Sequence, residues 1–496
     1  MTRVTAGNDR PIARGRYVLY WMIAARRARW SFALDHAIAR ARELGVPLVV
    51  LEALRAGYAH ASDRLHRFVI DGMDDNARAF DAAGVTYHAY VERAAGEGGG
   101  LLEALAARAS VVVTDEWPGF FVPRMVAAAA AKLRVRLELV DGNGLLPLRM
   151  HGRAFDSAIA FRRHWQRVIA PALAERPNAA PLEVLPRALR GGEIAGSILR
   201  RWPRAGAIDL ATLPIDHEVA PVRDRGGARA AAAALDHFIG DQLARYHEDR
   251  AQPGTGSGLS PYLHFGHVGA HEIIARVWDH AGWDPSRVSQ RAHGRREGWW
   301  GLPRAHETFM DQIVTWRELG FGFAFHVRDH TSWRSLPAWA RASLDQHASD
   351  PRTFRYSRDQ LARAQTHDPI WNAAQTQLRR DGRIDNYLRM LWGKKILEWS
   401  ASPRAALANL IALNDRYAVD GRDPNSYNGI CWTLGRFDRP WPERAIYGVI
   451  RSMSSERTAK KLDLREYMKT YAPGASLSSW PSSASRTTRR SSSRSR

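Results

Sequence analysis

Short apolar runs alternate with helix-like segments along the N-terminal part of the chain, and this alternation limits the fold more than any other feature. The runs are YVLYWM (17–22), PLVVLEA (47–53), VTYHAYVE (85–92), SVVVTDEW (110–117) and VRLELVDG (135–142). Strands that alternate with helices form βαβ units around a parallel sheet covered on both faces. Valine-rich runs are typical of strands buried on both sides. The sequence therefore predicts a Rossmann-like α/β domain over residues 17–141.

The pattern changes twice beyond this domain. Residues 142–234 are rich in proline, arginine and small residues, which indicates a long interdomain connection carrying short helices. Residues 235–471 show helical periodicity broken by Gly and Pro turns, which predicts an all-α domain. Residues 472–496 are a Ser/Arg segment with too little apolar surface to offset chain entropy, so we expect this tail to be disordered.

The charge balance is strongly basic. The 496 residues include 72 Lys and Arg against 51 Asp and Glu, a net charge of +21. The stretch 475–496 contributes five of those charges, and the remainder keeps +16. A basic body fits a protein that binds a nucleic-acid backbone. A solvated basic surface without a polyanionic partner is the alternative.

A single cysteine, Cys431, excludes an internal disulfide framework, a four-cysteine zinc site and a cysteine-ligated iron–sulfur cluster within this chain. Its apolar neighbours predict a buried, inert thiol, and no metal site is evident. No apolar run reaches the length of a membrane span, and the basic N-terminus lacks the apolar core of a signal peptide. We expect a cytoplasmic monomer with no membrane association and no obligate protein partner.

Three tryptophans, Trp371, Trp392 and Trp399, lie among basic residues between positions 367 and 399. Indole is readily oxidised by one electron. Trp392 and Trp399 are seven residues apart, which places them on one helix face about 10 Å apart along the axis. This spacing suits a short electron-hopping chain, although three aromatic residues that fill a helical core would show the same pattern.

Five blocks give this segment a wider context. They are GLSPYLHFG (258–266), QIVTWREL (312–319), YSRDQLARAQTHDPIWNAAQ (356–375), YLRMLWGKKILEW (387–399) and LNDRYAVDGRDPNSYNGICW (413–432). In this order they resemble class II cyclobutane-pyrimidine-dimer photolyases of the photolyase/cryptochrome superfamily, and the resemblance extends over most of residues 17–471. It implies a carbon–carbon lyase that repairs UV-damaged DNA by electron transfer from photoexcited reduced FAD. A cryptochrome-like blue-light photoreceptor without repair activity is the alternative.

The resemblance also implies where FAD binds, in the helical domain. Arg389 and Asp420 match the pair that brackets the isoalloxazine, and Asn414 matches the amide facing flavin N5, where it could switch between donor and acceptor. A structural salt bridge and a turn asparagine are the ordinary alternatives. The candidates for the rest of the FAD cradle are Tyr246, Gly258, Leu259 and Ser260. Ser260 alone, before Pro261, would more simply be a helix N-cap. In photolyases the corresponding α/β domain can hold an antenna chromophore, and this sequence leaves open both whether one binds and which one.

For the electron path, the resemblance implies Trp392 nearest the flavin, then Trp371 and Trp399, with Tyr356 as a weaker candidate. This path would restore the reduced flavin and is separate from the repair step.

At the substrate face, Trp316 and Trp432 resemble aromatic walls that stack on the dimer, and Met390 an apolar contact beside it. The chain departs from the family at Gln312, where these photolyases typically carry a glutamate that hydrogen-bonds the dimer. An amide can donate but cannot hold a transferable proton, so we expect slower dimer splitting. The adjacent Asp311 points about 100° away on a helix and is a poor substitute.

Two further segments have two readings each. The glycine-rich loop GEGGG (96–100) could present backbone amides to a phosphate, but it lacks the dinucleotide-binding spacing and more simply predicts a turn. The segment 276–309 carries many tryptophans and arginines, which suits either a DNA-contacting surface or helix packing.

Overall fold

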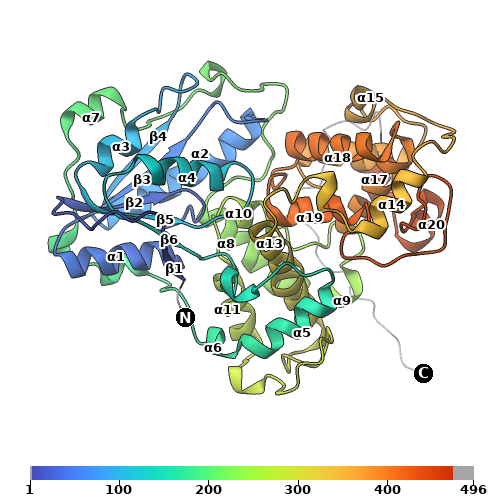
Figure 1. The fold of residues 1–496 in the computed structure, drawn as a ribbon, viewed down its shortest axis with the longest axis horizontal. Helices are drawn as coiled ribbons and strands as arrows, with labels where there is room; N and C mark the ends of the chain where they lie inside the picture. Colours follow the sequence, from blue (N-terminus) through green and yellow to red (C-terminus); the bar gives the residue numbers. More distant parts are fainter. Residues whose placement is uncertain (1–2, 473–496) are drawn as a thin grey trace, which may run out of the picture.

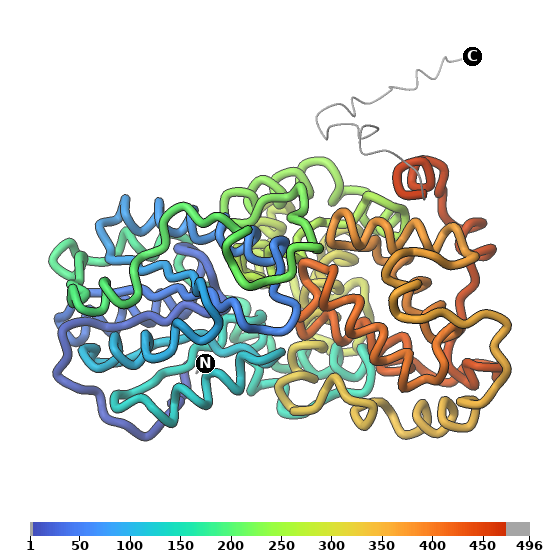
Figure 2. The backbone as a smooth tube through the Cα atoms, turned by 90° about the horizontal axis from the view of Figure 1, so that it is seen from above, coloured from blue at the N-terminus to red at the C-terminus, as the bar shows by residue number. Residues whose placement is uncertain are grey.

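The computed structural model describes residues 3–472. An α/β region, blue to cyan in Figure 1, lies at one end of the molecule, and the last helices, orange to red, lie at the other. The view from above in Figure 2 shows the same elongated arrangement, with yellow-green helices between the two ends. The predicted Ser/Arg tail falls outside the described residues except for its first position.

Six strands form one sheet in the order β1-β6-β5-β2-β3-β4. They are β1 (Val4–Ala6), β2 (Tyr17–Met22), β3 (Leu48–Leu54), β4 (Thr86–Val91), β5 (Ala109–Asp115) and β6 (Leu137–Val140). Every pair is parallel except β1 with β6. The predicted α/β fold is therefore confirmed, and the short antiparallel edge strand β1 is an addition to it.

Helices cover both faces of this sheet. On one face, α1 (Phe32–Leu44) and α2 (Asp63–Ala82) pack on side chains such as Val18 and Val50. On the other face, α3 (Leu101–Ala106) and α4 (Val122–Lys132) pack on alternate residues such as Leu19 and Val49. Successive residues of one strand thus bury against opposite helical layers, which explains the continuous apolar runs. The GEGGG loop forms the turn before α3, where the Glu92 carboxylate accepts from the Gly98 amide.

The connection from 142 to 234 contributes core side chains to both regions. Its helices are α5 (Ala158–Val168), α6 (Ala170–Leu173), α7 (Gly196–Arg201) and α8 (Ala228–His237). Phe161 and Trp165 of α5 are buried in the first helical core, and Ile198 of α7 packs under the sheet beside α3. Residues 142–234 are therefore partly buried, although their proline-rich sequence is typical of a surface connection.

The helical region has two hydrophobic cores. Its helices are α9 (Tyr246–Asp249), α10 (Ser260–His264), α11 (Ala270–His280), α12 (Arg304–Met310), α13 (Arg317–His326), α14 (Ala338–Gln346), α15 (Arg358–Ala362), α16 (Pro369–Asp381), α17 (Asn386–Trp399), α18 (Pro403–Tyr417), α19 (Pro424–Trp432), α20 (Ser455–Lys461) and α21 (Arg465–Tyr471). The first core lies around α5, α11 and α12, and the second around α16 to α19.

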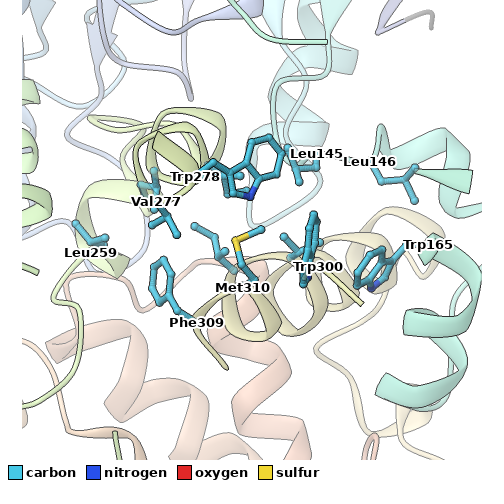
Figure 3. Close-up of a cluster of buried hydrophobic side chains, with 14 of the residues drawn as sticks. Leu145, Leu146, Trp165, Leu259, Val277, Trp278, Trp300, Phe309 and Met310 are labelled. Carbon is cyan, nitrogen blue, oxygen red and sulfur yellow. The ribbon is translucent and has the colours of Figure 1, made fainter. Parts of the chain in front are cut away.

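Tryptophans of the 276–309 segment fill the first core. Trp278, Trp299 and Trp300 are at most 2% exposed, and Figure 3 shows Trp278 and Trp300 beside Met310 and Trp165. Trp165 meets Trp299 edge to face with ring centroids 4.9 Å apart. The structure therefore supports the packing interpretation of this segment.

The two regions meet at the carboxyl ends of β2 and β5. The Asp115 carboxylate accepts from the Tyr20 hydroxyl and from three consecutive amides beginning at Ile23. Arg27 donates to the Gly266 carbonyl, and a Cβ on Gly266 would lie 1.7 Å from the Ala24 carbonyl oxygen. Open α/β sheets bind ligands in such a crevice. Here the turn between α10 and α11 covers it, leaving a cavity of about 30 Å³.

Candidate functional site

Side chains from α17, α18 and the following turn meet at one buried point. Arg389 donates from Nη2 to Asn414 Oδ1 at 2.7 Å and to Ser426 Oγ at 2.6 Å. Its Nη1 lies 3.7 Å from Asp420 Oδ2. Asn414 and Asp420 are 2% and 7% exposed. The three residues expected around the isoalloxazine are therefore neighbours in the structure, and Ser426 is a fourth member that the sequence analysis missed.

The Asn414 amide has a defined orientation. Its Nδ2 donates to the Gly421 carbonyl at 2.6 Å and to Asp415 Oδ1 at 3.1 Å, while its Oδ1 accepts from Arg389. A carbonyl only accepts and a guanidinium only donates, so the amide fits one way round. The switching amide suggested by the sequence would thus first have to give up its bond to Gly421.

Asp415 supports this arrangement from behind. Its Oδ2 accepts from the Tyr427 hydroxyl at 2.7 Å, and both residues are 4% exposed. Burial raises the pKa of Asp415 to about 6, although the Tyr427 bond and the Arg422 charge oppose that shift. Neither partner was singled out from the sequence, although Asp415 adjoins Asn414 and Tyr427 lies in the same block.

The loop from Gly258 to Ser260 approaches Arg383, which lies three residues before α17. Gly258 has φ +69°, a conformation that favours glycine, and a Cβ on it would lie 3.5 Å from Arg383 Nη1. Leu259 is buried in the first core, whereas Ser260 is exposed and is the first residue of α10 rather than its N-cap. Further along, His264 Nδ1 lies 3.5 Å from Asp423 Oδ2. The loop therefore lies against the segment that precedes α17, and α10 lies against the segment that precedes α19.

Tyr246 stands at the start of α9, in the first core. Its ring meets Phe238 and Phe309 edge to face, each with centroids 5.5 Å apart. Phe309 lies on α12, so Tyr246 packs beside the helix that ends two residues before Gln312.

The three predicted redox tryptophans are brought together in the second core. Trp371, Trp392 and Trp399 are 0%, 2% and 1% exposed. Trp371 Nε1 donates to the Trp392 carbonyl at 3.0 Å, and the Trp371 and Trp399 rings are 5.5 Å apart. Tyr356 continues the series with its ring 5.4 Å from Trp399 and its hydroxyl 2.7 Å from His367 Nδ1. A contact path thus runs from α17 to the half-buried Tyr356.

The predicted substrate residues come from two places. Gln312 and Trp316 lie on a π-helical segment, Asp311–Trp316, between α12 and α13. Such segments are frequent at functional sites. Asp311 faces away from them, because its Oδ1 accepts from Arg162 Nε at 2.9 Å and the residue is 5% exposed. This agrees with the expectation that Asp311 is a poor substitute for a glutamate at 312.

Met390 lies on α17, and Trp432 is the last residue of α19. Met390 lines an open groove of about 440 Å³, and the groove residue Arg451 lies 5.6 Å from the Trp432 ring centroid. The helix that ends at Trp432 approaches α13 closely, since a Cβ on Gly320 would lie 3.1 Å from Asn425 Cα. Trp316, four residues before Gly320, instead packs against the first core.

The groove beside Met390 is basic and aromatic. Its lining includes Tyr387, Trp441, Arg444, Arg451, Arg457 and Lys461. Asp438 pairs with Arg451 at 2.9 Å. This surface was not predicted from the sequence, although WPERAIYGVIRSMSSERTAKK (441–461) carries the alternation of aromatic and basic residues typical of nucleic-acid surfaces.

Within residues 3–472, no group of three His, Cys, Asp or Glu could hold a metal ion. Of the helices described, none is long and apolar enough to cross a membrane. Cys431 is buried, and burial raises the pKa of its thiol.

Comparison with known proteins gives the family. No family model matches the chain. Deoxyribodipyrimidine photo-lyase of Methanothermobacter thermautotrophicus is 32% identical over 467 residues, covering 93% of this chain and 95% of the relative. The Oryza sativa subsp. japonica protein of that name is 31% identical over 473 residues, covering 91% and 86%.

Solved structures agree on the fold. The cryptochrome of Synechocystis sp. PCC6803 superposes with a TM-score of 0.69 at 15% identity, covering 92% of this chain and 88% of the other. A bacterial class III photolyase from Agrobacterium tumefaciens gives 0.66 at 17%, covering 92% and 87%. From the similarity to its curated relatives over nearly its whole length, the chain belongs to the deoxyribodipyrimidine photo-lyase family.

Proposed function

We propose that this protein is a light-driven DNA repair enzyme, a class II photolyase that splits cyclobutane pyrimidine dimers. The observation that carries the proposal is the position of Arg389 on α17. It bonds Asn414 and pairs with Asp420, while Trp392 and Met390 on the same helix lead to the buried indoles and to the basic groove. The order of the five sequence blocks supports class II, and membership of the photo-lyase family supports the activity.

Reduced FAD fits the residues present. The opposite charges of Arg389 and Asp420, with the oriented Asn414, suit a polar ring that becomes anionic on reduction. The Gly258 turn has φ +69° and lies near the Arg383 guanidinium, which suits the phosphate end of the cofactor together with Leu259 and Ser260. When bound and photoexcited, reduced FAD supplies an electron to the dimer.

The remaining groups position the substrate. Trp316 and Trp432 would stack on the extruded bases, worth about 1–3 kcal/mol per base. A damaged, poorly stacked dimer is the cheapest to extrude, which gives the first selectivity. Arg444, Arg451, Arg457 and Lys461 would bind backbone phosphates along the groove. Gln312 would donate its amide to a dimer carbonyl without offering a proton.

We further propose residues 17–141, 142–234 and 235–471 as the α/β domain, the connection and the FAD- and DNA-binding domain of a monomer acting on UV-damaged DNA. A cryptochrome-like photoreceptor remains the second candidate, because Gln312 replaces the glutamate typical of repair enzymes.

One assay separates the two functions. Purified, photoreduced protein is mixed with an oligonucleotide carrying one thymine dimer, and 260 nm absorbance is followed in blue light and in the dark. We expect recovery in light alone, and none with an oligonucleotide carrying a (6-4) photoproduct. A yellow protein that photoreduces but restores neither substrate would establish the photoreceptor instead.

A further inference from the structure

Lys394 is fully buried against Trp432, the aromatic residue expected to stack on the damaged base. Its Nζ donates to the Thr433 carbonyl at 2.7 Å and lies 4.7 Å from the centroid of the Trp432 ring. The side chain is 0% exposed. This distance is within the range in which a cation interacts with an aromatic face, about 6 Å.

The charge near Trp432 is only partly balanced. Arg451 lies 5.6 Å from the same ring. Asp438 is the nearby carboxylate, but it already pairs with Arg451 at 2.9 Å. Within the described part of the chain Lys394 makes no ion pair of its own, so one excess positive charge remains beside the indole.

The redox tryptophans on the other face of α17 have a different environment. Trp392 Nε1 donates to the neutral Gln375 amide at 2.8 Å, and Trp371 Nε1 donates to a backbone carbonyl. Lys395 does lie 5.5 Å from the Trp399 ring, but it pairs with Glu398 at 3.0 Å. Two successive lysines thus lie beside two different indoles, and only Lys394, beside Trp432, has no carboxylate paired with its charge.

We propose that Lys394 protects Trp432 from one-electron oxidation, so that the oxidising equivalent passes to Trp392 and Trp371 while Trp432 stays intact as a stacking surface. Loss of one electron turns the indole into a radical cation, and a second positive charge 4.7 Å away raises the energy of that state. The electron would go to a photoexcited oxidised flavin, so the source of the oxidant rests on the proposed function.

The charge on Lys394 can be varied without a mutation. Burial lowers the pKa of Lys394 to about 7, with Arg451 adding to the shift and Asp438 opposing it. Bonds from Arg451 keep the pKa of Asp438 low despite burial. The Tyr447 hydroxyl, which bonds the Lys394 carbonyl and Glu398, has its pKa raised well above 10 by burial. Between pH 6 and 8.5, Lys394 is therefore the group that changes charge beside Trp432.

The first test needs no flavin. The full-length apoprotein is exposed to azide radicals generated by radiolysis, and oxidised tryptophans are quantified by peptide mass spectrometry. The readout is oxidation of Trp432 relative to Trp316, another half-buried indole. We expect this ratio to rise about tenfold from pH 6 to pH 8.5 in the wild type. Lys394→Met should give the high ratio at both pH values, and the matched control Lys395→Met should behave as the wild type.

A ratio that is the same at both pH values in the wild type would overturn the proposal, and this result does not depend on the folding of any variant. So would Lys394→Met giving the wild-type ratio at pH 6. Blue light on FAD-loaded protein is the second test, where Lys394→Met should accumulate oxidised Trp432 and the wild type at pH 6 should not. An effect in the apoprotein combined with no FAD binding would uphold the role of Lys394 and overturn the proposed function.

Discussion

Replacing Arg162 by Met should loosen the π-helical segment that carries Gln312 and Trp316. The Arg162 and Asp311 side chains are 7% and 4% exposed and lie 2.9 Å apart. Arg162 also donates to the Gly294 carbonyl at 2.9 Å. Removing one partner of a buried ion pair costs about 3–5 kcal/mol, and the lost hydrogen bond to the Gly294 carbonyl adds about 1 kcal/mol. We therefore expect the free energy of unfolding to fall by about 4–6 kcal/mol.

Two variants serve as controls in urea unfolding followed by tryptophan fluorescence. Arg163→Met changes an exposed neighbour that makes one long bond, 3.4 Å, to the His293 carbonyl, and it should cost less than about 0.5 kcal/mol. The double variant Arg162→Met with Asp311→Leu removes both buried charges. It should recover most of the loss, because an apolar pair often replaces a buried ion pair at little cost.

Arg162→Met remaining within about 1 kcal/mol of the wild type at an unchanged m-value would refute the argument. A double variant no more stable than the single one would refute the assignment of the loss to an unpaired Asp311. Affinity for dimer-containing DNA gives an independent readout, and it should fall in Arg162→Met because Gln312 and Trp316 lose their fixed orientation.

Three further predictions concern the electron path, the substrate contact and pH. Trp371→Phe should abolish photoreduction of the oxidised flavin yet preserve repair by chemically reduced protein. The control is Trp339→Phe, which changes a tryptophan of the same core that lies off the electron path. Normal photoreduction in Trp371→Phe would exclude this electron path. Gln312→Glu should raise the repair quantum yield, and an unchanged yield would show that position 312 does not limit splitting. Burial raises the pKa of Glu318 to about 7 from an ordinary 4.5. Because the folded state then holds the proton more tightly, the free energy of unfolding should fall by up to about 3 kcal/mol as pH rises from about 4.5 to about 7. Glu318→Gln should flatten that part of the pH profile of the urea midpoint, and an identical profile would contradict the assignment.

The fold was predictable where local pattern and tertiary position agree. Five buried strands can be predicted from their apolar runs. The edge strand β1 has only three residues and pairs with β6 alone, so it is too short to show a periodic pattern in the sequence. The burial of Trp165 could not be foreseen either, because prolines and arginines around α5 indicate a surface segment.

The site was predictable as a set of residues and less so as a geometry. Sequence blocks identified Arg389, Asn414 and Asp420, which the structure brings together. The orientation of the Asn414 amide depends on the Gly421 carbonyl, and a backbone atom leaves no signature in composition. The groove formed by residues 441–461 was overlooked because its basic residues become a surface only when they lie beside Met390.

The contact between Gly266 and Ala24 makes the α/β region a structural support for the helical region. Gly266, which follows α10, packs against Ala24 and accepts from Arg27, both of which follow β2. The α/β region therefore holds the C-terminal end of α10 in place. A protein truncated to its helical region would lose this support for α10 and for the Gly258 loop that precedes it. The sheet is therefore needed to keep the shape of the helical region, whether or not the α/β region binds a chromophore.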